Sequence, residues 1–395
     1  MRSALLSVGA GSLLVALGCA YWAAKRKNVF IWIGGYLLQT VRRALIRGDG
    51  DRPIHILFCF VDHFEPASSA QMEAWQTKYP RLAARHWDSD GVPPQHTWFY
   101  PGEQYQPEYL DALSDLARQG LGEIELHLHH GYDTAESLRA RLEQCLREYE
   151  RYGALVVGGT APTRAYAFIH GNLALDNSMS DPRLCGVNNE LEILQATGCY
   201  ADFSMPTAPS RSQTRKINSM YYAIDDPGAP KSHDTGADVT VGGRQREGLL
   251  IIQGPLALDW RRRKFGVLPR IDNAEIVESY PATPERIERW VRQHIHVKGR
   301  PEWVVVKVSC HGAEPRNLDA LLGGTADGLY TCLERRFRDC TGYRLHYVTA
   351  RELYNIVKAA EGGAEGDPGE FRNFLIAPYL NRPAMVDDSW KIHAK

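Results

Sequence analysis

Short apolar runs of strand length alternate with helical patterns along most of the chain. Residues Ile54–Val61 (IHILFCFV) form a nearly continuous apolar run, which is typical of a strand buried on both faces. Pro107–Gln119 has leucines at helical spacing, and Gly120 is placed to end that helix. Further strands are predicted at 95–100, 123–129, 165–170, 200–204, 249–253, 303–310 and 345–349. Strands that alternate with helices predict an α/β fold with mostly parallel strands.

The stretch Glu123–Thr134 (EIELHLHHGYDT) carries the strongest chemical signal. Its first seven residues alternate polar and apolar, so His127 and His129 are expected to project from one face of a strand. His130 and Gly131 begin the turn that follows. Three histidines within four residues are suited to converge on one cation, because imidazole is the usual nitrogen ligand of zinc and related metals. The alternative interpretation is a patch of hydrogen-bonded histidines.

Other reactive side chains also fall where predicted strands end. The full set is Asp62, His63, His127, His129, His170 and His311. In α/β folds the site lies at the carboxyl ends of the strands, so this shared position predicts one site. Two alternatives stay open, namely that Asp62 caps the next helix and that His311 only satisfies backbone groups. Asp133, with Glu136 three residues later, predicts the start of the helix after the histidine strand.

The amino-terminal region predicts a membrane anchor. Residues Ala4–Ala24 carry no charge, and about 20 apolar residues are enough to cross a bilayer. A cleaved signal peptide is the competing interpretation. The excess of basic residues after this stretch favours a single-pass protein of the inner membrane with its body on the cytoplasmic side, the periplasmic side being the alternative. Residues Val29–Leu38 (VFIWIGGYLL) are expected either to lie in the membrane interface on anionic lipid or to pack on the globular body.

Composition limits the class of protein and its organisation. The chain has 395 residues, of which 44% are hydrophobic and 24% charged, as in ordinary globular proteins. A net charge of −1 gives no support for nucleic-acid binding. Eight scattered cysteines without a CxxC pair argue against a disulfide framework and a zinc ribbon. The predicted segments are an anchor (1–27), a basic juxtamembrane or interfacial segment (28–52), a globular α/β body (53–360), and a linker with a carboxyl-terminal tail (361–395).

Taken together, three motifs resemble those of the polysaccharide deacetylase superfamily. Phe60-Val61-Asp62-His63 stands where that family ends its first strand in paired aspartates. Glu123-Ile124-Glu125-Leu126-His127 is similar to the family's E-I-G-x-H strand. Val306–Gly312 (VKVSCHG) resembles the late strand that ends in a general-acid histidine. The resemblance spans about residues 54–350 and implies an incomplete (β/α)7 barrel for the body, in addition to the predicted transmembrane helix.

The resemblance implies a metal-dependent hydrolase that removes an N-acyl (acetyl) group from a sugar in polysaccharide or glycolipid biosynthesis. It assigns Asp62 as the general base and His311 as the general acid. The expected metal ligands are His63, His127, His129 and His130, and the expected substrate-binding residues are Glu65, His170 and Asn172. The implied cofactor is a divalent ion, zinc with nickel or cobalt as alternatives. The implied partners are a carbohydrate or lipid-linked sugar and membrane lipid.

The chain departs from the family pattern at three places, which keeps other functions open. His63 replaces the second aspartate, His129 or His130 stands in for a histidine expected near Gly131, and His170-Gly171-Asn172 replaces an arginine-proline motif. One alternative is a glycosidase on the same fold, which needs two carboxylates flanking the bond. Its candidates are Asp62 with Glu65, Asp176 or Asp202. The other alternative is an inactive barrel that binds glycan or acts as a scaffold.

Overall fold

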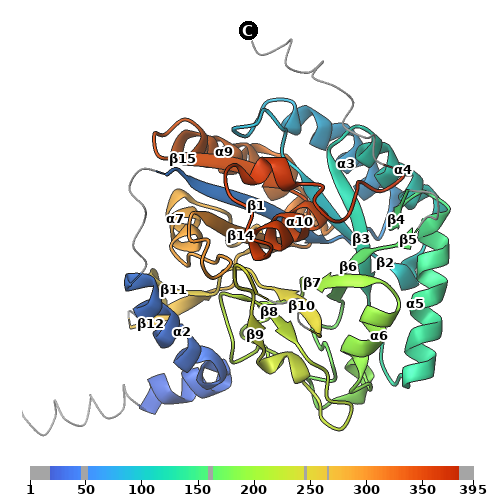
Figure 1. Cartoon of the computed structure of the whole chain (residues 1–395), viewed down its shortest axis with the longest axis horizontal. Helices are drawn as coiled ribbons and strands as arrows, with labels where there is room; N and C mark the ends of the chain where they lie inside the picture. The colour runs from blue at the N-terminus through green and yellow to red at the C-terminus, as the bar shows by residue number, and fades with distance from the viewer. Residues whose placement is uncertain (1–17, 46–51, 159–162, 244–246, 265–266, 382–395) are drawn as a thin grey trace, which may run out of the picture.

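A large, mostly parallel sheet forms the centre of the computed structural model, and helices cover it (Figure 1). The structure describes residues 18–45, 52–158, 163–243, 247–264 and 267–381. The strands are β1 (Ile54–His63), β2 (His96–Pro101), β3 (Gly122–Leu128), β4 (Val156–Val157), β5 (Thr163–Arg164), β6 (Tyr166–His170), β7 (Cys199–Asp202), β8 (Met220–Ala223), β9 (Ala237–Asp238), β10 (Leu249–Ile252), β11 (Ala257–Lys264), β12 (Leu268–Asp272), β13 (Glu275–Ile276), β14 (Trp303–Cys310) and β15 (Tyr343–Val348). The helices are α2 (Val29–Ala44), α3 (Ser69–Ala83), α4 (Pro107–Arg118), α5 (Ala135–Glu150), α6 (Glu190–Ala196), α7 (Pro284–Val291), α8 (Pro315–Leu322), α9 (Gly324–Leu333) and α10 (Ala350–Glu361).

The order of the strands corrects the expected barrel. The eleven-stranded sheet runs β13-β14-β1-β2-β3-β6-β7-β10-β8-β9, and β15 also pairs with β1. Strand β1 pairs with β15 along its first part and with β2 along its last part. The paired residues are Ile54–Cys59 with β15 and Phe60–His63 with β2. The pairs β10–β8 and β8–β9 are antiparallel. The expectation of a seven-stranded (β/α) barrel with a transmembrane helix is therefore wrong, and the fold is a mixed α/β fold with a large, mostly parallel sheet.

The two faces of the sheet pack in two separate cores, because successive strand side chains point to opposite faces. In β1, Ile56, Phe58 and Phe60 join the core under the surrounding helices. The alternate residues Leu57, Cys59 and Val61 join a second core with β7, β10 and α10. The same alternation continues to the end of β1, so the side chains of Asp62 and His63 point to opposite faces of the sheet.

The amino-terminal region does not contain a membrane-spanning helix in its described part. Of the predicted span Ala4–Ala24, residues 4–17 lie outside the described residues. Residues 18–26 are helical, and Asn28, with φ 53°, separates them from the 16-residue helix α2. Among the described helices none is both long enough and apolar enough to cross a bilayer. The predictions of a transmembrane helix and of a single-pass inner-membrane protein are corrected accordingly.

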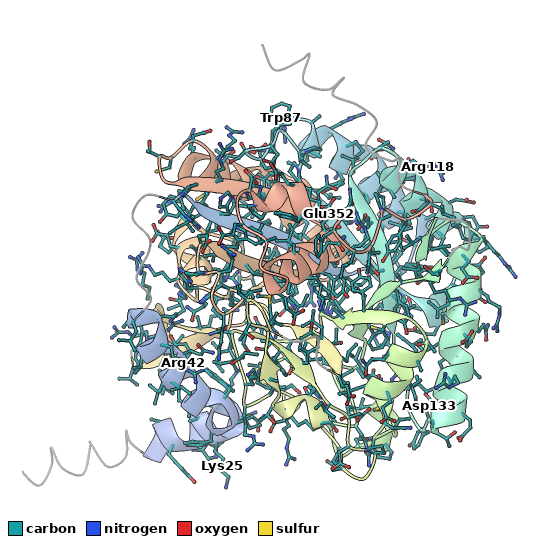
Figure 2. The ribbon with its side chains drawn as sticks, viewed as in Figure 1. Lys25, Arg42, Trp87, Arg118, Asp133 and Glu352 are labelled. Carbon is teal, nitrogen blue, oxygen red and sulfur yellow. The ribbon has the colours of Figure 1, made fainter. Side chains whose placement is uncertain are left out.

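Helix α2 packs on the globular body. Trp32 is fully buried in a small core with Ala208, Ile217 and Leu256. Asn28 donates a hydrogen bond from its side-chain amide to the carbonyl of Pro209. In Figure 1, α2 lies beside the hairpin of β11 and β12, and in Figure 2 Lys25 and Arg42 mark the two amino-terminal helical segments. Residues 29–38 therefore pack on the globular body, which is one of the two arrangements predicted for them.

The region expected to be a linker also packs against the body as far as it is described. Tyr379 is buried, and its hydroxyl lies 2.7 Å from the carboxylate of Glu125. The buried guanidinium of Arg351 donates hydrogen bonds to the carbonyls of Arg372 and Ile376. Residues 382–395 of the predicted tail lie outside the described residues. The described part of the segment therefore belongs to the globular body and is not a loose linker.

Candidate active site at the carboxyl ends of the strands

Four imidazoles meet at the carboxyl ends of β1, β3 and β14. The ring centroid of His63 lies 4.7 Å from that of His311 and 4.9 Å from that of His127. The centroid of His129 lies 4.7 Å from that of His127. His63 and His127 belong to the strand face that also carries Val61 and Glu125, because strand side chains alternate. The predicted convergence of His63, His127, His129 and His311 is present in the structure, and we call these four residues the histidine rim.

Glu65 lies between the members of the histidine rim. One of its carboxylate oxygens is 3.1 Å from Nε2 of His127 and 3.8 Å from Nε2 of His129. Ligand atoms of Glu65, His63 and His311 also lie within 4.8 Å of one another. Glu65 was predicted to bind substrate, and the structure places its carboxylate where it contacts the imidazoles directly.

Two further carboxylates orient the outer imidazoles. His129 Nδ1 lies 2.5 Å from a carboxylate oxygen of Glu103, which follows β2. His311 Nδ1 lies 3.4 Å from a carboxylate oxygen of Glu275 in β13. In each pair the carboxylate contacts Nδ1 and leaves Nε2 available, and Nε2 of His129 lies 3.8 Å from Glu65. This is the arrangement that fixes the tautomer and orientation of a proton-transferring histidine.

The inner imidazoles are held in the neutral form. Burial and the nearby rings of His127 and His311 hold the pKa of His63 well below its ordinary value. Burial also lowers the pKa of His127, although Glu65 opposes the shift. Neutral imidazole is the form that binds metal ions. Burial disfavours the Glu65 carboxylate, but the hydrogen bond with His127 and the neighbouring imidazoles outweigh it and lower the pKa of Glu65.

The pKa values of the outer imidazoles, His129 and His311, are raised. Burial alone would lower the pKa of His129, but the hydrogen bond and charge of Glu103 raise it overall. The pKa of His311 is raised in the same way, because the hydrogen bond and charge of Glu275 outweigh burial. The rim therefore combines two neutral rings with two rings that take up a proton more readily.

Asp62 lies behind the rim instead of facing it. Its Oδ1 accepts a hydrogen bond of 2.6 Å from the backbone N–H of Gly312, and its Oδ2 lies 2.8 Å from Nε2 of His96. The side chain is fully buried, and a Cβ added at Gly312 would lie 2.0 Å from Oδ2. The geometry therefore supports a role for Asp62 in positioning the turn that carries His311. The predicted role of Asp62 as general base stays a prediction.

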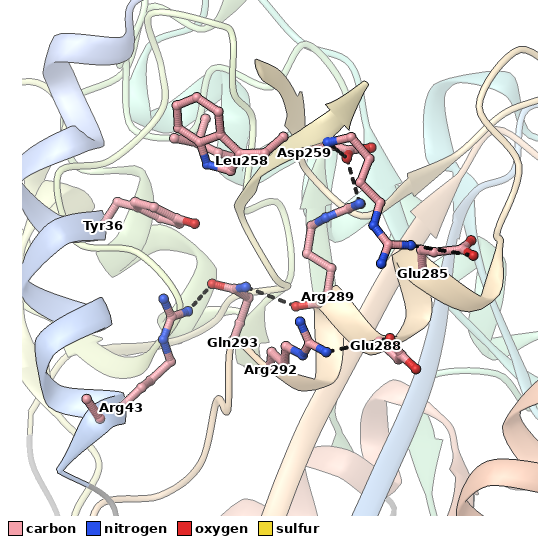
Figure 3. Close-up of a pocket in the computed structure, with 12 residues that line it drawn as sticks. Tyr36, Arg43, Leu258, Asp259, Glu285, Glu288, Arg289, Arg292 and Gln293 are labelled. Carbon is pink, nitrogen blue, oxygen red and sulfur yellow. Dashed lines mark hydrogen bonds and ion pairs between the residues drawn. The ribbon is translucent and has the colours of Figure 1, made fainter. Parts of the chain in front are cut away.

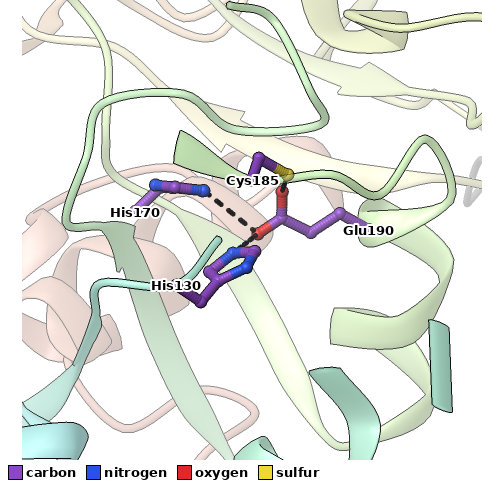
Figure 4. Close-up of side chains that lie close together, drawn as sticks. All are labelled: His130, His170, Cys185 and Glu190. Atoms are coloured by element: carbon purple, nitrogen blue, oxygen red, sulfur yellow. Dashed lines mark hydrogen bonds and ion pairs between the residues drawn. The ribbon is translucent and has the colours of Figure 1, made fainter. Parts of the chain in front are cut away.

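The structure separates His130, His170 and Asn172 from the rim. Nε2 of His130 lies 3.1 Å from Glu190, and the rings of His130 and His170 are 4.5 Å apart (Figure 4). The side-chain amide of Asn172 donates a hydrogen bond to the carbonyl of His130. His130, predicted as a metal ligand, and His170, predicted to bind substrate, thus belong to a second, buried cluster, and Asn172 lies beside it.

The two other aspartates considered for a glycosidase form hydrogen bonds with serines outside the rim. Asp176 accepts a hydrogen bond from the backbone N–H of Ser232, and Asp202 accepts one from the hydroxyl of Ser204. Among the described residues, the hydrogen bonds of these carboxylates do not connect them to Glu65.

The donor set of the rim fits a divalent transition-metal ion. His63, Glu65 and His127 offer two neutral imidazoles and one carboxylate, which are ligand types of catalytic zinc sites. The Nδ1 atom of His127 is buried and has no hydrogen-bond partner among the described residues.

Sequence reasoning missed the carboxylates that organise both clusters. Glu103, Glu275 and Glu190 lie outside the motifs, in a turn, a two-residue strand and the first turn of a short helix. A weak signal existed for Glu103, because it comes just after the predicted strand 95–100. The hydrogen bond of His96 to Asp62 was also missed, although His96 is part of the same predicted strand.

A separate hollow of about 490 Å³ lies between α2, β11 and α7 (Figure 3). It contains none of the imidazoles of the rim. Three of its four arginines are in ion pairs, since Arg289 contacts Asp259, Arg261 contacts Glu285 and Arg292 contacts Glu288. The fourth, Arg43, contacts the side-chain amide of Gln293.

Comparisons with known proteins leave the family open. No protein-family model matches the chain, and no curated protein matches it. Among solved structures, a 4-alpha-glucanotransferase from Thermococcus litoralis aligns with a TM-score of 0.38 and 13% sequence identity. The alignment covers 75% of this chain and 39% of that chain. A similarity this low carries no argument about the function of the chain.

Proposed function

We propose that the chain is a metal-dependent hydrolase that removes an N-acyl group, such as acetyl, from an amino sugar of a polysaccharide or glycolipid. The observation that carries the proposal is the convergence of four imidazoles around Glu65 at one edge of a parallel sheet. The motif resemblance supports the choice of an N-acylated sugar as the substrate class.

The inner residues of the rim are suited to hold the ion. His63, Glu65 and His127 would be its ligands, and zinc, nickel and cobalt all accept this donor set. When bound, such an ion lowers the pKa of a water molecule and polarises the acyl carbonyl.

The outer residues of the rim are suited to move protons. His129, oriented by Glu103, is placed to accept the proton of the attacking water at Nε2. His311, oriented by Glu275, is placed to deliver a proton from Nε2 to the leaving nitrogen. The products would be a carboxylate and a free amine on the sugar. Two histidines that are each oriented by a carboxylate are the arrangement that general acid–base catalysis needs.

The proposal is tested by measuring acetate released from N-acetylglucosamine oligomers. Chelator-treated protein should be inactive and should regain activity with added zinc, cobalt or nickel. His311→Ala should bind the ion but lose about 10²–10⁴-fold in turnover, because only the proton donor is removed. His294→Ala is a matched control outside the rim and should keep full activity.

Two outcomes would contradict the proposal. If His311→Ala turns over as fast as the wild type, His311 is not the acid of the reaction. If the wild type binds no zinc, cobalt or nickel and releases no acetate, the rim is a hydrogen-bonded histidine patch and a glycan-binding scaffold becomes the better account.

A further inference from the structure

The second cluster gathers four potential metal ligands from four segments of the chain. His130 follows β3, His170 ends β6, Cys185 lies in the loop before α6, and Glu190 begins α6 (Figure 4). All four side chains are buried. Each residue offers one ligand atom, and these atoms lie within 4.8 Å of one another.

The distances within the cluster are near the edge lengths of a tetrahedral site. Oε1 of Glu190 lies 3.1 Å from Nε2 of His130 and 3.8 Å from Nε2 of His170, and its Oε2 lies 3.4 Å from Sγ of Cys185. Zinc ligands stand roughly 2.0–2.3 Å from the ion, so neighbouring ligand atoms of a tetrahedron are about 3.3–3.8 Å apart. The donor set of two nitrogens, one sulfur and one oxygen suits a borderline-soft ion.

An unsatisfied nitrogen points into the cluster independently of these distances. Nε2 of His170 is buried and has no hydrogen-bond partner among the described residues. The other ring nitrogen of His170 lies 3.5 Å from the backbone N–H of Ala174, at the outer limit of a hydrogen bond. A buried polar atom without a partner costs about 1–3 kcal/mol, which a bound ion would remove.

The residues around the cluster resemble the outer shell of a metal site. Nδ1 of His130 lies 3.1 Å from the carboxylate of Asp133, which also accepts a hydrogen bond from Ser137. Oε2 of Glu190 accepts a hydrogen bond from the backbone N–H of Asp176. Histidine ligands of metals usually donate their second N–H to a carboxylate or carbonyl in this way.

The cluster is distinct from the histidine rim although His129 and His130 are adjacent in the sequence. The ring of His129 lies against Gly171, where an added Cβ would come within 2.5 Å of the ring. The ring of His130 instead faces Glu190 and His170. Consecutive side chains at the end of β3 thus serve two different sites.

We propose that His130, His170, Cys185 and Glu190 bind one zinc-class divalent ion in a closed, structural site. Four buried protein ligands leave no position for substrate, which is the property of structural sites as opposed to catalytic ones. The ion would tie the loops after β3 and β6 to the first turn of α6. This site supports the loops next to the rim and takes no part in the proton transfers described above.

The site is tested by loading the full chain with cobalt and recording its absorption spectrum. The wild type should show a near-ultraviolet thiolate-to-cobalt band, because Cys185 is the sulfur ligand. Cys185→Ser should lose this band, and Cys145→Ser, which removes a buried thiol in α5, should keep it. His170→Ala should bind one zinc fewer per chain than the wild type and melt at a lower temperature.

The rim and the second site are distinguished by His127→Ala, which should keep the cobalt–thiolate band. If the wild type itself lacks the thiolate-to-cobalt band, the proposal is overturned. This result does not depend on whether Cys185→Ser folds. An unchanged band in Cys185→Ser, or an unchanged zinc content in His170→Ala, would also overturn it. The cluster would then be a buried hydrogen-bonded pair of His130 and Glu190.

Discussion

At the scale of single residues, strand alternation decides which side chains take part in chemistry. Asp62 and His63 are neighbours in the sequence, but only His63 stacks on His311. Asp62 instead accepts the N–H of Gly312 and contacts His96 in the core behind the rim. The two neighbours therefore contact the segment that carries His311 in different ways, His63 through ring stacking and Asp62 through hydrogen bonds.

Asp62→Asn separates a positioning role from a general-base role. The variant should lose about 1–3 kcal/mol of stability, because Asn has one acceptor oxygen where Asp62 uses two, and cannot accept from both Gly312 and His96. Turnover should fall through displacement of His311, while the bound metal stays. The pH–rate profile should keep its acidic limb, which checks the positioning role. Loss of that limb with an unchanged melting temperature would instead identify Asp62 as the base.

The residue scale also shows where sequence reasoning reached its limit. The alternation in Glu123–His129 correctly placed His127 and His129 on one face, because a period of two is a local property. It did not reveal that His130 turns to a second cluster, since Glu190 is 60 residues away. Asp133 was predicted to cap α5, but Thr134 is the cap and Asp133 contacts His130. Both sites thus depend on partners that local patterns do not show.

At the scale of elements, a buried ion-pair network joins α7 to the hairpin of β11 and β12. Asp272 of β12 accepts hydrogen bonds of 2.7 Å from both Arg286 and Arg289. Trp290 also donates a hydrogen bond to the same carboxylate. Burial opposes ionisation of Asp272, but the hydrogen bonds and charge of Arg286 outweigh it and lower the pKa of Asp272.

This network predicts how stability depends on pH. A carboxylate whose pKa is lowered on folding contributes stability that is complete above its unfolded pKa of about 3.9. The contribution is lost as the pH falls through the lower, folded-state pKa. Asp272→Asn should cost about 3–5 kcal/mol at neutral pH, because the buried Arg286 loses its carboxylate partner.

Urea unfolding at pH 7 and near pH 3 checks this prediction. The difference in unfolding free energy between the wild type and Asp272→Asn should shrink at the lower pH. Glu288→Gln, which alters a partly exposed pair with Arg292, is the control and should change stability by less than about 1 kcal/mol. A difference that stays constant with pH would mean that Asp272 stabilises α7 without its charge.

The elements themselves were the most predictable part of the fold. The apolar run Ile54–Val61 became β1, and the leucine pattern of Pro107–Gln119 became α4. Their long-range pairing was not predictable, because β15 enters beside β1 from nearly 300 residues later in the chain. The two-residue strand β13, which supplies Glu275, is also too short to give a periodic signal.

At the scale of the whole molecule, α2 forms part of the globular core. Its apolar sequence predicted contact with lipid and packing on the body equally well. Hydrophobicity alone does not show whether lipid or protein covers an apolar helix face. Trp32 settles the matter for the described residues, since it is fully buried against Ala208, Ile217 and Leu256. The arginine at the other end of the helix, Arg43, pairs with Gln293.

Trp32→Ala should therefore destabilise the full chain. Removing a buried tryptophan leaves a cavity, and the expected loss is about 3–5 kcal/mol of unfolding free energy. Leu37→Ala, on the exposed face of the same helix, should cost much less. Thermal or urea unfolding of the two variants checks the prediction. Equal stability of Trp32→Ala and the wild type would show that residues from 53 onward fold without support from α2.

We propose that the histidine rim holds a divalent ion. The zinc content of His127→Ala tests this proposal most directly. The variant and the wild type should be loaded with zinc, freed of excess ion and analysed for zinc per chain, with His294→Ala as the control for loss of a histidine. We expect His127→Ala to hold one zinc fewer than both. Equal zinc content in the three folded proteins would contradict the claim.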